Sequence, residues 1–174
     1  MGMPEERALF SDKAPGLFSE GGGALVIRPM LEEDLPEVLE IEYACFSQPW
    51  PEKIFREALA LQAYHFLIGC IGDEIAGYCG SLQSFENADI VSIAVRSDLR
   101  RRGIGEKLLE RLMADGRLAG VERFFLEVRQ SNESAIALYE KAGYRIQGRR
   151  KNYYDAPRED ALIMWTDAEE EKPR

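Results

Sequence analysis

A short loop rich in arginine and glycine is the part of the sequence with the clearest chemical use. It contains Arg100, Arg101, Arg102, Gly103, Ile104 and Gly105. The segment before it is rich in Ile and Val, as in a strand, and the segment after it has the apolar spacing of a helix. A helix that begins here would offer unpaired backbone N–H groups, and glycines let a phosphate approach the backbone closely. The loop therefore predicts a phosphate-binding site, unless it is only a basic turn that caps a helix.

Two common phosphate-binding loops do not fit this sequence. A P-loop requires a lysine after its last glycine, but Glu106 follows Gly105. A dinucleotide-binding turn requires a third glycine at the position of Leu108, within a run of parallel strands. The remaining pattern is Arg or Gln, two residues, Gly, one residue, and Gly or Ala, directly after a strand.

A second chemical feature is a carboxylate inside an apolar strand. Glu127 stands in the run Phe-Phe-Leu-Glu-Val, and strand alternation places it on the face opposite Leu126 and Val128. A buried carboxylate is costly unless it is paired or used in chemistry. Glu127 could therefore pair with an arginine across the sheet, or it could act as a base that takes a proton from an amine.

The cysteines and the single histidine do not indicate covalent or metal chemistry. Cys45, Cys70 and Cys79 are odd in number and lack C-x-x-C spacing, which favours reduced, buried thiols in a cytoplasmic protein. His65 stands in an apparent strand, and no nucleophile elbow accompanies it. We therefore expect structural roles for these four residues and no metal site.

The elements that must position these residues follow from hydrophobic periodicity and turn signals. Asp34 is expected to cap a helix, and Gly143 to end one. The expected order is strand 24–28, a helix after residue 34, helix 52–61, strands 64–70, 74–82 and 88–95, helix 103–115, strand 123–128, helix 132–142, and strands 144–149 and 161–165. This order predicts an α/β (α+β) sheet that is mostly antiparallel early and uses crossover helices later.

The chain has room for one domain with two extensions. Residues 1–24 are polar and end in three glycines, so they are predicted to be an extension or linker, although Leu17 and Phe18 could dock on the domain. Residues 25–166 form the predicted domain, and residues 167–174 an acidic tail. Neither a signal peptide nor a membrane span is expected, which again favours the cytoplasm.

Together, these blocks resemble the GNAT N-acetyltransferase family, and within it the ribosomal-protein alanine N-acetyltransferases of the RimI type. The likeness covers about residues 25–166 and depends on the joint order of several blocks. These are Ser92-Ile-Ala-Val95 before the residue 100–105 loop, Leu126-Glu-Val-Arg129, Ser131-Asn132, Ala135 to Tyr144, Arg149 to Tyr154, and Arg158 to Ala161. Ser92 stands where the family often has asparagine, so this chain lacks the side-chain amide at that position.

The resemblance implies a fold, a cofactor and a set of site residues. The fold is the GNAT acyl-CoA N-acyltransferase fold, with a central mixed sheet of about six to seven strands and about four helices. The co-substrate is acetyl-CoA, with no metal. The implied cofactor-binding residues are Ile93, Ala94, Val95, Arg100, Arg101, Arg102, Gly103, Ile104, Gly105, Glu106 and Asn132.

The resemblance also implies a catalytic pair, Glu127 as general base and Tyr139 as general acid. A protonated α-amine must lose its proton before it attacks a thioester, and the leaving thiolate needs a proton donor. Each residue has a purely structural alternative: Tyr139 could be a half-buried core aromatic. Asn132, which the resemblance places beside the pantetheine arm, could be only a helix N-cap.

The acceptor side is less clearly marked. Candidate substrate-binding residues are Trp50, Tyr153 and Tyr154, with Gln48, Pro49 and Asp155 beside them. They could instead belong to loops that pack on the core. The neighbouring run Arg149-Arg150-Lys151 is expected to carry surface or sheet-edge charges.

The charge of the chain constrains its partners. A formal net charge of −9 with a pI of about 4.8 excludes a broadly basic nucleic-acid-binding protein, so an anionic cofactor must be held locally. The resemblance implies acetylation of the N-terminal alanine of a small-subunit ribosomal protein, whose basic N-terminal segment an acidic enzyme would attract. We expect a monomer or weak dimer without direct nucleic-acid or membrane contacts. The alternatives are a lysine or small-amine N-acetyltransferase, and a non-catalytic acyl-CoA-binding sensor.

Overall fold

A seven-stranded mixed sheet in the order β2-β3-β4-β5-β6-β8-β7 runs through the computed structural model, which describes residues 8–9 and 23–167. An additional short strand, β1, pairs with β5 outside this order. The strands are β1 (Ala8–Leu9), β2 (Leu25–Pro29), β3 (Tyr64–Ile71), β4 (Glu74–Ser84), β5 (Asn87–Val95), β6 (Arg123–Arg129), β7 (Arg145–Asp155) and β8 (Arg158–Asp167). The helices are α1 (Leu35–Cys45), α2 (Glu52–Leu59), α3 (Ile104–Leu118) and α4 (Glu133–Lys141), with short 3-10 turns η1 (Glu32–Asp34) and η2 (Ser97–Leu99).

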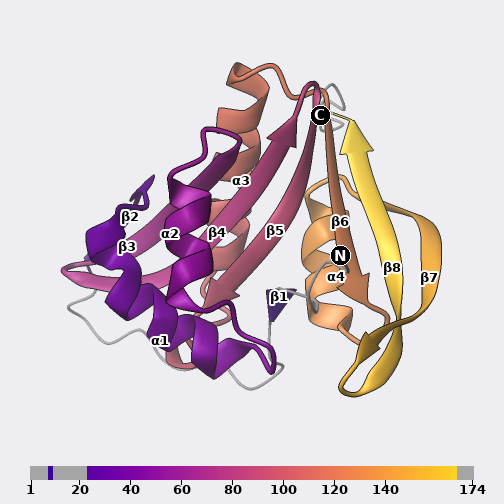
Figure 1. Ribbon diagram of the computed structural model, residues 1–174, viewed down its shortest axis with the longest axis horizontal. Helices are drawn as coiled ribbons and strands as arrows, with labels where there is room; N and C mark the ends of the chain where they lie inside the picture. The colour runs from indigo at the N-terminus through magenta and orange to yellow at the C-terminus, as the bar shows by residue number, and fades with distance from the viewer. Residues whose placement is uncertain (1–7, 10–22, 168–174) are drawn as a thin grey trace.

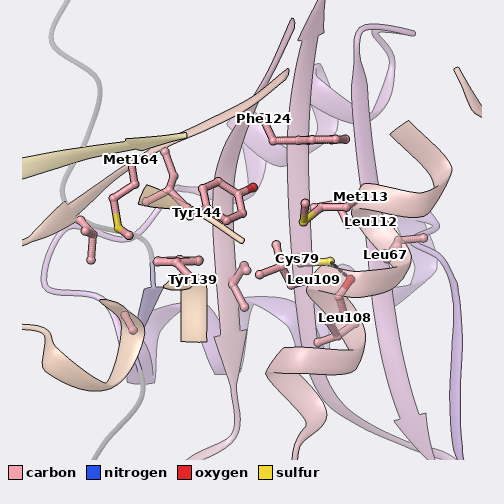
Figure 2. Close-up of a cluster of buried hydrophobic side chains, with 14 of the residues drawn as sticks. Leu67, Cys79, Leu108, Leu109, Leu112, Met113, Phe124, Tyr139, Tyr144 and Met164 are labelled. Atoms are coloured by element: carbon pink, nitrogen blue, oxygen red, sulfur yellow. Dashed lines mark hydrogen bonds between the residues drawn. The ribbon is translucent and has the colours of Figure 1, made fainter. Parts of the chain in front are cut away.

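Helices cover both faces of the sheet and create two hydrophobic clusters. Helices α1 and α2 lie on one face, and α3 and α4 lie on the other (Figure 1). The cluster under α1 and α2 includes Phe55, Tyr78 and Ala94. The cluster under α3 and α4 includes Val128 and Tyr139, and Figure 2 shows its side chains meeting between α3, α4 and the sheet. The sheet therefore has two separate buried faces.

Strands β5 and β6 stay paired only at one end. Their parallel pairing joins Asn87–Asp89 to Arg123–Phe125, and the described pairing goes no further along the two strands. Beyond that point β5 continues along β4, and β6 continues along β8. In Figure 1 the two strands diverge toward the end where β1 lies. This divergence leaves residues 93–95 of β5 unpaired with β6, just before the arginine-rich loop, and β1 pairs with β5 there at Ile93 and Ala94.

The expected fold class is confirmed, because every predicted helix and strand is present with shifted ends. The Gly72-Asp73 hairpin joins β3 to β4, and Gly143 adopts a left-handed φ of 94° after α4. The last two strands are longer than expected, since β7 runs up to the turn at Ala156-Pro157 and β8 begins directly after it. No strand was expected at residues 8–9, and the possible docking of Leu17 and Phe18 falls outside the described residues.

One capping prediction was wrong. Asp34 precedes α1 but makes no side-chain cap to it. Its carboxylate instead accepts from the Leu31 N–H at 2.8 Å and pairs with Arg28 at 2.7 Å. The charged partner Arg28 on β2 binds the short acidic side chain, which would otherwise turn to the helix.

None of the helices in the described part of the chain is long and apolar enough to cross a membrane.

Candidate active site

The arginine- and glycine-rich loop leads into the first turn of α3. Gly103 occupies the N-cap position with a φ of 75°, a left-handed conformation that glycine adopts without strain. Arg101 also has a positive φ, of 65°. The turn therefore exposes the unpaired N–H groups at the start of a 15-residue helix, where an anion is stabilised.

A cavity of about 390 Å³ lies between this turn and α4. The loop and the end of β5 contribute Val95, Leu99, Arg100, Arg101, Gly103, Ile104, Gly105 and Glu106, and α4 contributes Ser134, Ala137, Leu138 and Lys141. The sequence analysis missed the four α4 residues, although their spacing along the predicted helix marks one face. The lining does not include the predicted residues Ile93, Ala94, Arg102 and Asn132.

Two of the charged side chains that line this cavity, Arg100 and Lys141, already contact other groups of the protein. The Arg100 Nε donates to the Val95 carbonyl at 3.0 Å, and its Nη2 lies 3.2 Å from the Cys45 Sγ. Lys141 of α4 pairs with Glu106 of α3 at 2.8 Å. An anionic group in the cavity would therefore meet backbone N–H groups of α3 together with Arg101 and Lys141, while Arg100 braces the loop.

The other predicted cofactor residues occupy defined structural positions. Asn132 is the N-cap of α4, and its Oδ1 accepts from the Ala135 N–H at 3.1 Å. The side chains of Ile93 and Ala94 are fully buried, so only their backbone could meet a ligand. That backbone pairs in parallel with β1, with Ala8 opposite Ile93 and Leu9 opposite Ala94. The N-terminal strand therefore occupies the β5 edge to which the resemblance assigns the pantetheine.

Glu127 is held by two side chains of β7. Its Oε1 lies 3.0 Å from the Arg150 Nε, and the Tyr153 hydroxyl hydrogen-bonds to the same carboxylate. Burial and this carboxylate together raise the pKa of Tyr153 well above its usual value, so the phenol remains the donor. The pairing with an arginine that the sequence left open is thus present. A carboxylate can still accept a further donor, because its two oxygens offer about four lone-pair sites.

Tyr139 lies on the other side of the sheet from Glu127. It is 2% exposed on α4, and its ring centroid lies 5.6 Å from that of Tyr144. Figure 2 shows the two side chains next to each other in the cluster. Leu126 and Val128 belong to the same cluster as Tyr139, so Glu127 between them faces away from it. The two groups could act on one substrate only where β5 and β6 are unpaired, along the β5 edge with which β1 pairs.

The three candidate acceptor residues separate into different environments. Tyr153 contacts Glu127, as described above. Tyr154 is buried, and the Arg129 guanidinium lies 4.2 Å from its ring centroid. The Trp50 ring packs edge-on against Phe55 at 5.5 Å in the cluster under α1 and α2. Of the three, only Tyr153 is placed directly beside the candidate base.

The remaining reactive side chains have structural surroundings. His65 of β3 lies 2.9 Å from Asp115 of α3. Cys45 and Cys79 are buried, and burial raises the pKa of both thiols. Within residues 23–167, no group of three or more His, Cys, Asp or Glu side chains is arranged to hold a metal ion.

Comparison with known proteins agrees with this geometry. Residues 35–144 match the model of the acetyltransferase (GNAT) family. The ribosomal protein bS18-alanine N-acetyltransferase of Escherichia coli K12 is 38% identical over 133 residues, which cover 75% of this chain and 89% of that protein. The crystal structure of the ribosomal-protein-S18-alanine N-acetyltransferase from Escherichia coli superposes with a TM-score of 0.78 at 33% identity, over 87% of this chain and 98% of that one. Ard1 from Thermoplasma volcanium shares the fold, with a TM-score of 0.76 over 83% of this chain and 97% of that one at 24% identity. The chain therefore belongs to the GNAT family of acetyltransferases.

Proposed function

We propose that this enzyme transfers the acetyl group of acetyl-CoA to the N-terminal α-amine of a protein, and that the acceptor is the N-terminal alanine of a small-subunit ribosomal protein. The GNAT family uses acetyl-CoA, and the cavity at the start of α3 supports this co-substrate because it lies at a helix N-terminus, where a pyrophosphate would be stabilised. The acceptor proposal is supported by the Escherichia coli relative named for alanine acetylation of ribosomal protein bS18, which is 38% identical.

The observation that carries the mechanism is the divergence of β5 from β6, with Glu127 on one face of the sheet and Tyr139 on the other. A thioester that took the place of β1 along this edge of β5 would lie between the two faces and could meet groups from both. In the proposed reaction the amine nitrogen attacks the thioester carbonyl carbon, so that a C–N bond forms and the C–S bond breaks. Glu127 takes the amine proton, and Tyr139 gives its proton to the leaving thiolate and regains one from water.

The cofactor would be held mainly by backbone groups. The N–H groups of the first turn of α3 would bind the pyrophosphate, with Arg101 and Lys141 at the rim of the cavity. The backbone of Ile93, Ala94 and Val95 would align the acetyl-pantetheine along β5. The Val95 carbonyl already accepts from Arg100, so this alignment depends chiefly on the other groups.

The net charge of −9 supports a basic polypeptide as the acceptor. An acidic enzyme raises the encounter rate with a basic segment, and salt weakens that effect. Arg150 and Tyr153 would orient the Glu127 carboxylate before the ammonium group arrives. Residues 25–166 would supply all of these groups, with the N-terminal extension and the acidic tail outside the reaction itself.

The proposal is tested with two basic peptides and acetyl-CoA. One peptide begins with a free alanine, and the other has the same sequence with a blocked N-terminus and one free lysine. We expect mass spectrometry to locate the acetyl group on the alanine α-amine of the first peptide. Modification of the blocked peptide alone would replace this proposal with lysine acetylation.

A further inference from the structure

We infer that Glu42 is a positioning residue for the acceptor, because it joins the loop between α1 and α2 to strand β5 through a buried chain of hydrogen bonds. This inference rests on the proposed function, in which the acceptor meets the thioester on the Glu127 side of β5. Glu42 lies in α1 and is fully buried. A carboxylate in such surroundings is strongly disfavoured unless donors satisfy it, so its partners define its role.

One end of the chain is the α1–α2 loop. The Glu42 Oε1 accepts from the Trp50 backbone N–H at 2.6 Å. Trp50 stands between Pro49 and Pro51, neither of which has a backbone N–H. In this tripeptide the Trp50 N–H is therefore the one main-chain donor, and it is directed to Glu42. Packing of the Trp50 ring against Phe55 fixes the same residue from its other side.

The other end of the chain is β5. The Glu42 Oε2 accepts from the Tyr78 hydroxyl, and the Tyr78 oxygen accepts from the Ser92 hydroxyl at 3.0 Å. Tyr78 and Ser92 are both buried, on β4 and β5. Ser92 directly precedes Ile93, the first residue of the proposed pantetheine edge. The serine that departs from the family's asparagine thus directs its hydroxyl into this chain.

The position of the chain predicts which substrate it affects. Trp50, Tyr78 and Ala94 belong to the cluster under α1 and α2, the face to which Glu127 points. The cavity at the start of α3 lies on the opposite face, between α3 and α4. Loosening the α1–α2 loop should therefore raise the KM for the acceptor much more than the Kd for acetyl-CoA.

The test compares Glu42→Gln with a matched packing variant. Glu42→Gln keeps the shape but replaces one acceptor oxygen with a donor, and we expect the acceptor KM to rise about tenfold. Val38→Ala opens space one helical turn earlier on α1, where Val38 is fully buried, and removes no hydrogen bond of the chain. At an equal loss of Tm, Val38→Ala should leave the acceptor KM within about twofold. Equal increases in KM for the two variants would overturn the positioning role.

The choice of peptide and a second measurement allow the inference to be tested whichever acceptor the enzyme uses, and even if Glu42→Gln does not fold. The kinetics use whichever of the two peptides the wild-type protein acetylates, so a change of acceptor class does not affect the comparison. Amide exchange at Trp50, followed by NMR in the free protein, should accelerate in Glu42→Gln and in the milder Tyr78→Phe variant. An unchanged Trp50 exchange rate and acceptor KM in folded Tyr78→Phe would contradict the inference even if Glu42→Gln does not fold.

Discussion

The cavity at the start of α3 and the surroundings of Glu127 lie on opposite faces of one sheet, and they are built by different means. The cavity is formed by a left-handed turn, a helix N-terminus and one face of α4. Glu127 depends on Arg150 and Tyr153, two side chains of a strand that is separated from β6 by β8.

The difference concerns which interactions each region can lose. We call the face with the cavity the proposed cofactor face, and the face with Glu127 the proposed acceptor face. Backbone groups at the cofactor face are fixed by chain conformation, so truncation of a single side chain removes little of the site. The acceptor face is a set of paired charges and hydroxyls, so the loss of one partner leaves another unpaired. We therefore expect side-chain substitutions to act most strongly on the acceptor face, and conformational substitutions on the cofactor face.

The largest effect is expected for Glu127→Gln. If Glu127 is the base, kcat should fall about 10³-fold, within the usual range for acid–base catalysis. The loss should be greatest at low pH, because an α-amine with a pKa of roughly 7.7–8.0 is then mostly protonated. Glu57→Gln, at an exposed residue of α2, serves as the control. A pH–rate profile of Glu127→Gln that parallels the wild type would exclude Glu127 as the base.

Tyr139 and Tyr144 form the next matched pair of variants. Their rings touch in the same cluster, but only Tyr139 is proposed to protonate the thiolate. Tyr139→Phe should slow release of free thiol about 10²-fold. Tyr144→Phe should leave the rate unchanged, because the Tyr144 hydroxyl is buried and has no hydrogen-bond partner in the part of the chain that the structure describes. Equal rates for the two variants would remove Tyr139 from the mechanism.

The local structure around the cavity could be predicted from neighbouring residues, because its signals are local. The strand–loop–helix order at Gly103 was predicted, and Asn132 takes the N-cap position that was its structural alternative. The lining residues of α4 were missed, although Lys141 follows Ser134 at the spacing of two helical turns. That periodicity was available before the structure.

The acceptor face could not be predicted in the same way, because it depends on strand order and register. Arg150 was expected at a surface or sheet edge, and it is indeed exposed on the edge strand β7. Its pairing with Glu127 was not predicted, because β7 continues beyond its expected end and has a register shift between Arg150 and Tyr154. These features bring Arg150 and Tyr153 to Glu127 across an intervening strand. Pairing of β1 with β5 was equally invisible, since a two-residue strand has no measurable periodicity.

Backbone conformation at Gly103 gives a smaller effect on the cofactor face. Gly103→Ala introduces a side chain at a φ of 75°, which costs about 1 kcal/mol and should raise the Kd for acetyl-CoA about fivefold. Gly72→Ala is the control, because Gly72 also has a left-handed φ and open space around it but lies in the β3–β4 hairpin. Both variants should lose similar Tm, and a similar change in Kd for both would show that the loop has no special role.

The pairing of β1 with β5 allows a test in the opposite direction. An extended pantetheine and β1 cannot both pair with the same edge at Ile93 and Ala94. Prolines at both positions of β1, Ala8→Pro with Leu9→Pro, should disrupt the pairing, because proline lacks the ladder N–H. Calorimetry should then show a Kd for acetyl-CoA about threefold lower, since more of the protein is competent to bind. A higher Kd would mean that β1 supports the cofactor instead of competing with it.

The smallest expected effect is the pH dependence of the stability that the Asp34–Arg28 pair contributes, on the side of the molecule that carries α1. The Arg28 hydrogen bond lowers the pKa of Asp34 although Asp34 is buried, and this pair anchors the start of α1, the helix that carries Glu42. A lowered pKa in the folded state stabilises the protein above the unfolded-state pKa, and that stability is lost as the pH falls through the folded-state pKa.

The Asp34→Asn variant tests this contribution. It should lower the free energy of unfolding by less than about 1 kcal/mol at pH 7, because Arg28 is 40% exposed and solvent screens the pair. The difference in unfolding free energy from the wild type should begin to shrink below about pH 4, the ordinary carboxyl pKa, and should vanish as the pH falls through the lowered folded-state pKa. Denaturant titrations at pH 7 and pH 3 measure it, and Glu57→Gln should show no comparable change. A difference that stays constant with pH would mean that Asp34 acts through its neutral hydrogen bond to Leu31, and the acceptor face would then be no more dependent on charge than the cofactor face.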